Sequence, residues 1–294
     1  MLICFMLYLS MLGLLIIIII FFYILYMYMS RYKTNKKIIV FDMDETLGYF
    51  TQLGIFISIL EDNIKRRITN QEFNLLMDLF PLYQRTNILS ILNYIKEKKQ
   101  QQQCYKVYIY TNNQGPKYWG LQIKQYFESK LNYPLFDKVI HAYKVNGVQI
   151  EKNRTSHNKS ILDLLKCTKL TKNVSICFID DQYHPYMLKP NSYYLHVKEY
   201  QYLYDPNVMF EKFKQHFQLN DNQINILKNT DKDIFIHFNN ESHKIKKSQE
   251  KISKQILHHL DVFFNKDNKD TKKHYLKSHK TQKNIKHYHY KRIL

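Results

Sequence analysis

Small residues are scarce in this chain of 294 residues, which has one alanine, six glycines and six prolines. It has four cysteines and no C-x-x-C pair, so neither a zinc site of that type nor a disulfide framework is indicated. The low glycine and proline content excludes a collagen-like chain. With 45% apolar residues and 15% aromatic residues, the chain is not wholly disordered and is long enough to bury one good core.

Lysine, by contrast, is abundant, and the formal net charge is +19. Such a charge is typical of proteins that bind polyanions. Residues with GC-rich codons are rare, however, whereas lysine, asparagine and tyrosine are frequent, which indicates a compositional bias and weakens that interpretation. Residues 38–240 are nearly balanced, with 25 basic and 20 acidic side chains, whereas residues 241–294 carry 15 basic and five acidic ones.

Charged side chains are absent from residues 1–30, and Leu14–Leu25 is apolar throughout. The uncharged stretch of residues 1–30 is long enough to span a bilayer as a helix, and the basic residues that follow it predict that the rest of the chain lies in the cytosol. We therefore expect a single N-terminal membrane anchor with a cytoplasmic-facing body. The alternative is that translation starts at Met27 or Met29, which would leave a cytoplasmic or nuclear protein.

Three short apolar runs, Ile38–Phe41, Val107–Tyr110 and Val174–Ile179, have the pattern of strands buried on both faces. Helical patterns separate them, and the one after Val107–Tyr110 begins at Pro116. Strands that alternate with helices predict an α/β protein with a central parallel sheet and a Rossmann-like, three-layer α/β/α fold. In such sheets ligands bind at the carboxyl ends of the strands.

Acidic residues follow two of these runs, Asp42 and Asp44 after the first and Asp180 and Asp181 at the end of the third. Carboxylates gathered at one edge repel each other unless a cation or proton intervenes, and their hard oxygen atoms suit Mg²⁺. We predict all four as metal ligands. A metal there would polarise a phosphoryl group for attack by Asp42, and Asp44 would protonate the leaving oxygen.

Four segments in order, FDMDETL (Phe41–Leu47), IYTNNQG, HNKSILDLL and FIDD, resemble the four motifs of the haloacid dehalogenase (HAD) superfamily over residues 38–217. The resemblance implies a catalytic domain with a small cap or flap. It implies roles for individual residues as follows: Asp42 as nucleophile, Asp44 as acid and base, Thr111 and Asn112 as phosphate-binding residues, Lys159 as the neutralising cation that also contacts phosphate, Asp180 and Asp181 as the metal-holding pair, and Thr46 as a brace for the first motif.

Each feature also has a plainer interpretation. Asp42 and Asp44 would form an ordinary turn after a strand, although a turn explains neither Lys159 nor the second acidic pair. Lys159 is one of 38 lysines and its assignment depends on its spacing from Asp180. Asn112 and its neighbours would be turn residues before a helix. His157 and His184 lie beside the third and fourth motifs, where either would be able to contact the phosphate or the leaving group, but for a single histidine we expect a structural or surface role.

Within the superfamily, DETL and IDD resemble the small C-terminal-domain (SCP/FCP, NLI-interacting) phosphatases, which act on phosphoserine and phosphothreonine. The Thr-Asn-Asn-Gln sequence departs from that group and is similar to second motifs of polynucleotide 3′-phosphatases. The combination also resembles HAD-like proteins of large DNA viruses. We therefore expect a Mg²⁺-dependent phosphatase acting on a phosphorylated macromolecule, more readily a protein than a nucleic acid. The alternatives are a polynucleotide 3′-phosphatase and a catalytically silent phosphate-binding scaffold.

The chain divides by pattern into a possible anchor (1–30), the HAD-like domain (38–240) with a cap or flap insertion (48–84), a basic amphipathic helix (241–264) and a basic tail (265–294). We expect the insertion to form one or two short apolar-faced helices and to leave the site open to a macromolecule. The tail has ten basic and two acidic residues and no large apolar stripe, so we expect it to be disordered. Its function would be contact with an acidic partner, or merely solubility.

Overall fold

The computed structural model describes residues 13, 16, 18–23, 36–217, 242–265 and 289–294. The chain forms two compact units, Met1–Lys36 and Lys37–Leu294. In the first unit, residues 13, 16 and 18–23 are helical and exposed. No helix within the described ranges is both long enough and apolar enough to cross a membrane. The predicted anchor, residues 1–30, lies largely outside those ranges and stays a prediction.

The second unit is built on a six-stranded sheet with the order β3-β2-β1-β6-β7-β8. The pairings β1–β2, β2–β3, β6–β7 and β7–β8 are all parallel, as the alternation of strands and helices predicts. The strands are β1 (Lys36–Phe41), β2 (Lys106–Tyr110), β3 (Lys138–Ile140), β6 (Val174–Asp180), β7 (Ser192–Val197) and β8 (His289–Ile293). A separate antiparallel hairpin consists of β4 (Lys144–Val145) and β5 (Val148–Gln149).

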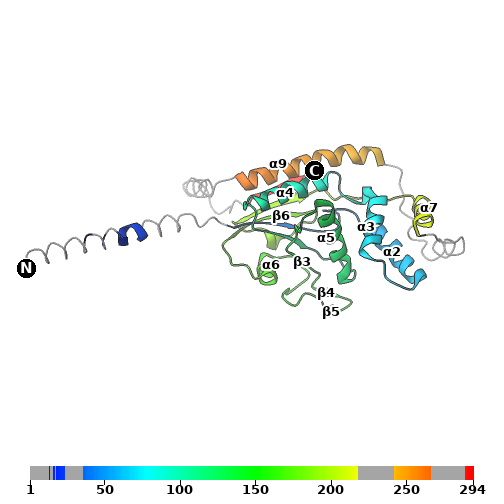
Figure 1. The fold of residues 1–294 in the computed structure, drawn as a ribbon, viewed down its shortest axis with the longest axis horizontal. Coiled ribbons are helices and arrows are strands. Elements are labelled where there is room, and N and C mark those ends of the chain that lie inside the picture. Colours follow the sequence, from blue (N-terminus) through cyan, green and yellow to red (C-terminus); the bar gives the residue numbers. More distant parts are fainter. Residues whose placement is uncertain (1–12, 14–15, 17, 24–35, 218–241, 266–288) are drawn as a thin grey trace, which may run out of the picture. The chain divides into compact units, whose positions relative to one another are not determined.

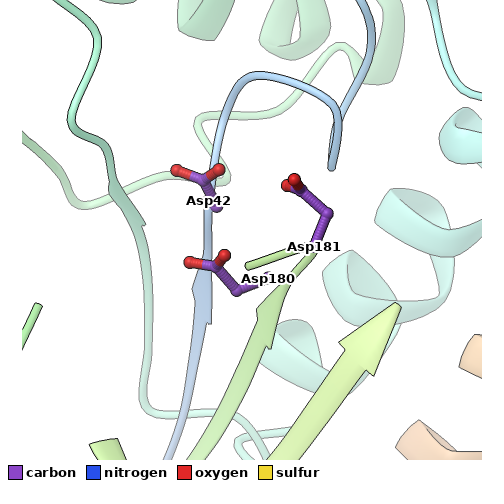
Figure 2. A group of neighbouring side chains, drawn as sticks. All are labelled: Asp42, Asp180 and Asp181. Carbon is purple, nitrogen blue, oxygen red and sulfur yellow. The ribbon is translucent and has the colours of Figure 1, made fainter. Parts of the chain in front are cut away.

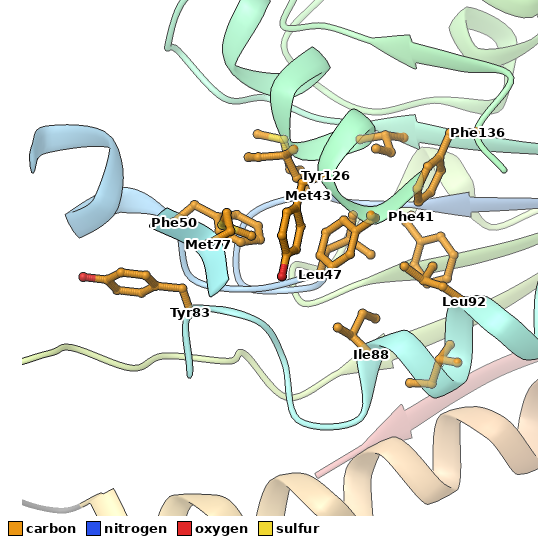
Figure 3. Packing of buried hydrophobic residues seen from close by; sticks show 14 of the residues in the cluster. Phe41, Met43, Leu47, Phe50, Met77, Tyr83, Ile88, Leu92, Tyr126 and Phe136 are labelled. Atoms are coloured by element: carbon orange, nitrogen blue, oxygen red, sulfur yellow. The ribbon is translucent and has the colours of Figure 1, made fainter. Parts of the chain in front are cut away.

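Side chains alternate in direction along each strand, and apolar side chains are buried on both faces of the sheet. In β1, Ile39 and Phe41 belong to one hydrophobic cluster, whereas Ile38 and Val40 belong to the cluster on the opposite face. Figure 3 shows part of the larger cluster, where Phe41 packs with residues of the surrounding helices and loops. The sheet is therefore the middle layer of a three-layer α/β/α fold, which confirms the predicted fold class.

Helices cover the two faces unequally (Figure 1). The larger cluster draws residues from α4 (Ile88–Gln100), α5 (Lys117–Leu131) and α9 (Ser242–Asn265). The smaller cluster draws them from α6 (Ile161–Thr168), with Met187 of the short 3-10 helix η2 (Pro185–Met187). α4, α5 and α6 occupy the positions that their apolar spacing predicts, and Pro116 is the N-cap of α5.

The predicted cap or flap segment, residues 48–84, folds into α2 (Thr51–Ile64), α3 (Asn70–Leu79) and the 3-10 turn η1 (Pro81–Tyr83). α3 begins with a capping box between Thr69 and Glu72. The apolar side of α2 packs on α7 (Pro206–Phe217), where Phe56 lies 5.0 Å from Phe210 between ring centroids. Both helices contribute to the larger cluster, so this segment is part of the main core.

The C-terminal region differs from the expected disordered tail at its end. α9 matches the helix predicted over 241–264, and its apolar stripe is buried in the larger cluster. Beyond it, residues 289–293 form β8, which pairs with β7 along its whole length. The segment HYKRI has no apolar run, so its strand conformation depends on pairing with β7 and on burial of Ile293. Residues 266–288 lie outside the described part of the chain.

Candidate functional site

Three carboxylates meet at the carboxyl ends of two neighbouring strands. Asp42 directly follows β1, and Asp180 and Asp181 stand at the end of β6 (Figure 2). The backbone N–H of Asp42 donates to the carbonyl of Ile179 at 2.9 Å, which ties the two strand ends together. One oxygen of each carboxylate lies within 4.8 Å of the others. The fold thus gathers three of the four carboxylates that the sequence predicts as metal ligands.

Lys159 reaches this group from the loop before α6. Its ammonium lies 2.5 Å from Asp42 Oδ1 and 2.7 Å from Asp180 Oδ2, and only 2% of the residue is exposed. The next residue, Ser160, caps α6 by accepting a hydrogen bond from the N–H of Asp163, which fixes the start of the helix. Burial alone lowers the pKa of Lys159, but the charges of Asp180 and Asp42 outweigh it and raise the pKa, so the side chain is an ammonium.

One ammonium among three carboxylates leaves excess negative charge in a buried place. Burial, with the charges of Asp180 and Asp181 added, raises the pKa of Asp42 well above its ordinary value against the opposing charge of Lys159. Burial and the charge of Asp180 raise the pKa of Asp181 to about 7. Burial also acts on Asp180, but Lys159 and His184 outweigh it, so its pKa is lowered. A divalent cation would offset this excess charge, and three carboxylate ligands are the donor set that hard cations prefer.

Asp44 lies outside this group, contrary to the prediction of four metal-binding side chains. Its Oδ2 accepts a hydrogen bond from Asn113 Nδ2 at 2.8 Å. The chain leaves β1 after Phe41 and turns at Glu45, whose φ of 59° is a left-handed conformation. The contact with Asn113 shows that Asp44 is directed toward the loop after β2. Burial raises the pKa of Asp44, although the hydrogen bond from Asn113 lowers it.

Two buried groups hold the loop after β1 in place. Thr46 Oγ1 donates to Asp181 Oδ1 at 2.7 Å and accepts from the N–H of Asp181 at 3.1 Å, which is the bracing role predicted for it. Arg85, 1% exposed, donates to the carbonyl oxygens of Glu45 at 2.7 Å and of Thr46 at 2.6 Å. Burial lowers the pKa of Arg85 to about 10. No role was predicted for Arg85; its signal in the sequence is an arginine three residues before the start of α4.

Thr111 and Asn112, the predicted phosphate-binding residues, follow β2 at the same edge of the sheet. Thr111 is buried, and its Oγ1 accepts from the N–H of Asn113 at 2.9 Å. A second buried arginine, Arg154, donates to Asn112 Oδ1 at 2.7 Å and to the carbonyl of Thr111 at 3.0 Å. Because the oxygen of the Asn112 amide is held by Arg154, its NH₂ group is left as the donor for a ligand. Arg154 was not predicted, because the two site residues that it contacts, Thr111 and Asn112, are more than 40 residues away in sequence.

The two histidines beside the motifs are in different places. His184 Nε2 lies 3.4 Å from Asp180 Oδ2, and the residue is buried, so it borders the carboxylate group. His157 packs its ring edge-on against Tyr143, which precedes the β4–β5 hairpin. Its backbone carbonyl accepts from Arg154 at 3.0 Å. His157 thus has a structural contact, whereas His184 is closer to the site than the sequence suggested.

Comparison with known proteins adds little. No protein-family model and no curated protein matches this chain. One solved structure that it is similar to is that of a Thermotoga maritima protein assigned as a beta-phosphoglucomutase, with 12% sequence identity over 60% of this chain and 90% of the other. The TM-score is 0.28, which does not establish a common fold. What the site can do therefore has to be inferred from the geometry of this chain.

Proposed function

We propose that this protein is a Mg²⁺-dependent phosphatase of the HAD type that acts through an aspartyl-phosphate. The observation that carries the proposal is the position of Lys159, which bridges Asp42 and Asp180 within a group of three carboxylates. The charge of Lys159 favours the ionised form of Asp42 against the effect of burial, and one ammonium among three carboxylates leaves an excess of negative charge that a divalent cation would offset. The order of the four sequence motifs supports the same assignment.

In the proposed reaction, Asp42 uses Oδ2 to attack phosphorus, because its Oδ1 contacts Lys159. The O–P bond to Asp42 forms as the bond to the leaving oxygen breaks. Thr111 and the NH₂ group of Asn112 would bind the phosphoryl oxygens. When bound to Asp42, Asp180 and Asp181, the cation supplies positive charge that stabilises the transferring phosphoryl group.

Asp44 is the proposed general acid and base. Burial raises its pKa, which favours the protonated form that the first step requires. It would give its proton to the leaving oxygen. In the second step it would take a proton from the water that attacks the phosphorus of the aspartyl-phosphate, which releases inorganic phosphate and restores Asp42. Asn113 holds Asp44 apart from the carboxylate group, as a separate role requires.

The activity test uses the full chain with p-nitrophenyl phosphate. We expect Mg²⁺-dependent release of phosphate, removed by EDTA, and a loss of at least about a thousandfold in Asp42→Asn, as for removal of a nucleophile. Asp62→Asn is the matched control, because Asp62 is an exposed aspartate on α2. Wild-type protein without activity, or Asp42→Asn with wild-type activity, contradicts the enzyme assignment.

For the substrate, we propose a protein phosphorylated on serine or threonine, by the resemblance of DETL and IDD. The Asn112 amide favours one second candidate, a 3′-phosphorylated polynucleotide, because that residue type recurs in the second motif of those enzymes. A phosphoserine peptide and a 3′-phosphorylated oligonucleotide are compared by kcat/KM at one Mg²⁺ concentration. Preference for the oligonucleotide overturns the first choice. Binding of either without turnover supports a silent scaffold that uses Thr111 and Lys159.

A further inference from the structure

A chain of two hydrogen bonds connects the C-terminal strand with the carboxylate group. The hydroxyl of Tyr290, on β8, lies 2.5 Å from Nδ1 of His196, and Nε2 of His196 lies 2.8 Å from the carbonyl oxygen of Asp181. A carbonyl only accepts, so Nε2 carries the hydrogen, and Nδ1 of the neutral ring accepts from Tyr290. β8 therefore supports the backbone of Asp181, whose side chain belongs to the proposed cation site.

A second contact comes from α9 and reaches the loop after β1. Oε1 of Gln249 accepts from Nη1 of Arg85 at 2.8 Å, and Nε2 of Gln249 donates to the carbonyl of Glu199 at 3.3 Å. The opposite side of the same guanidinium holds the carbonyl oxygens of Glu45 and Thr46. Gln249 is thereby one of the four acceptors of the buried Arg85, with the carbonyl oxygens of Glu45, Thr46 and Lys198, and it helps to hold the loop between Asp42 and Thr46.

Both contacts depend on docking of the C-terminal segment, which we define as the described residues 242–265 and 289–294. Its inward side chains Ile252, Ile256, Leu260 and Ile293 are buried in the same cluster as the core of the sheet. Lys37 Nζ also donates to the carbonyl of Phe264 at 2.6 Å. A protein that ended before this segment would keep every proposed catalytic residue but lose both supports of the loops that carry them.

We propose that the C-terminal segment completes the cation site, with Tyr290 and Gln249 as positioning residues for the loops that carry Asp181 and Asp42. This inference rests on the proposed function. It assigns a role to a part of the chain that composition marks only as a basic tail. Residues that hold the ligands of a metal ion in position affect the affinity for the metal as well as the structure, because a ligand that is free to shift binds the metal less tightly.

The test measures cation binding to the full chain by titration calorimetry with MgCl₂ and, separately, MnCl₂, at fixed pH and 20 °C. We expect Tyr290→Phe and Gln249→Leu each to raise the dissociation constant by about tenfold, within the range for such outer partners. Lys291→Gln and Lys254→Gln are the matched controls on β8 and α9, because both lysines are exposed. We expect the controls to bind as the wild type does.

Thermal unfolding without cation separates positioning from simple stabilisation. Tyr290→Phe removes one hydroxyl and keeps the ring, so the variant is expected to be folded at 20 °C. A lower Tm with an unchanged dissociation constant in both variants overturns the inference and leaves the proposed function intact. A wild-type protein that binds neither cation overturns both. Weaker binding in the two variants, with kcat recovered at high Mg²⁺, is the supporting result.

Discussion

Replacing Lys159 by methionine tests the charge balance of the site directly. The ammonium makes two buried ion pairs, at 2.5 Å to Asp42 and 2.7 Å to Asp180, and its removal leaves three buried carboxylates with no cation. Removing one partner of a buried ion pair costs about 3–5 kcal/mol. For a domain of this size that loss lowers Tm by roughly 6 to 20 °C. We expect this loss at pH 8 in EDTA.

The loss of unfolding free energy in Lys159→Met should depend on pH in a known direction. Without Lys159, burial and mutual repulsion raise the pKa of Asp42 and Asp180 in the folded chain above their unfolded values. A raised carboxylate pKa penalises the folded state increasingly as pH rises above the unfolded pKa, about 4. In the wild type, by contrast, the lowered pKa of Asp180 contributes stability that is present above that pH. The deficit of the variant is therefore larger at pH 8 than at pH 5.

Urea unfolding at pH 5 and pH 8, followed by the fluorescence of the single tryptophan, Trp119, measures this difference. Trp119 is buried against Phe73, so its emission reports unfolding of the core. Lys166→Met, at an exposed lysine of α6, is the control and should change the unfolding free energy by about 0.5 kcal/mol or less. A deficit below 1 kcal/mol at pH 8, or one equal at both pH values, refutes the charge-balance reasoning.

Three further predictions concern the same unit. Because the pKa of Asp181 is about 7, cation binding should release a proton near pH 6.5, and the affinity for the cation should rise by up to about tenfold per pH unit below pH 7. Calorimetry in two buffers of different ionisation enthalpy measures the proton release. Equal cation affinity at pH 6 and pH 8 is the contrary result. Gly48→Ala places a Cβ 2.3 Å from the carbonyl of Tyr83 and should cost about 1–3 kcal/mol in urea unfolding, whereas Gly54→Ala meets only an ordinary contact at 3.4 Å and should not destabilise. Thr69→Ala removes the capping box of α3 and should cost about 1 kcal/mol, which Thr69→Ser should restore; a Thr69→Ala protein as stable as the wild type contradicts this.

Three of the strands could be predicted from the sequence because each is a short apolar run, and the burial of β1, β2 and β6 on both faces explains that pattern. The other strands have weaker local signals. β3 has three residues, and β8 (HYKRI) is largely polar. Their conformation is stabilised by a neighbouring strand, which no window of sequence contains. The same is true of the end of the chain, where the composition suggested disorder.

Local sequence was enough to identify the side chains at the carboxyl ends of β1, β2 and β6. A strand that is buried on both faces appears locally as a short apolar run, so the residue that follows it is known once the run is recognised, and Asp42, Thr111 and Asp180 were placed in this way. The folded chain alone settles which of these side chains meet and that Asp44 lies apart. It also brings Gln249 to Arg85, 164 residues away, and Arg85 holds the carbonyl oxygens of Glu45 and Thr46. A buried arginine donates to the acceptors that the folded chain places around it, so its partners depend on long-range packing.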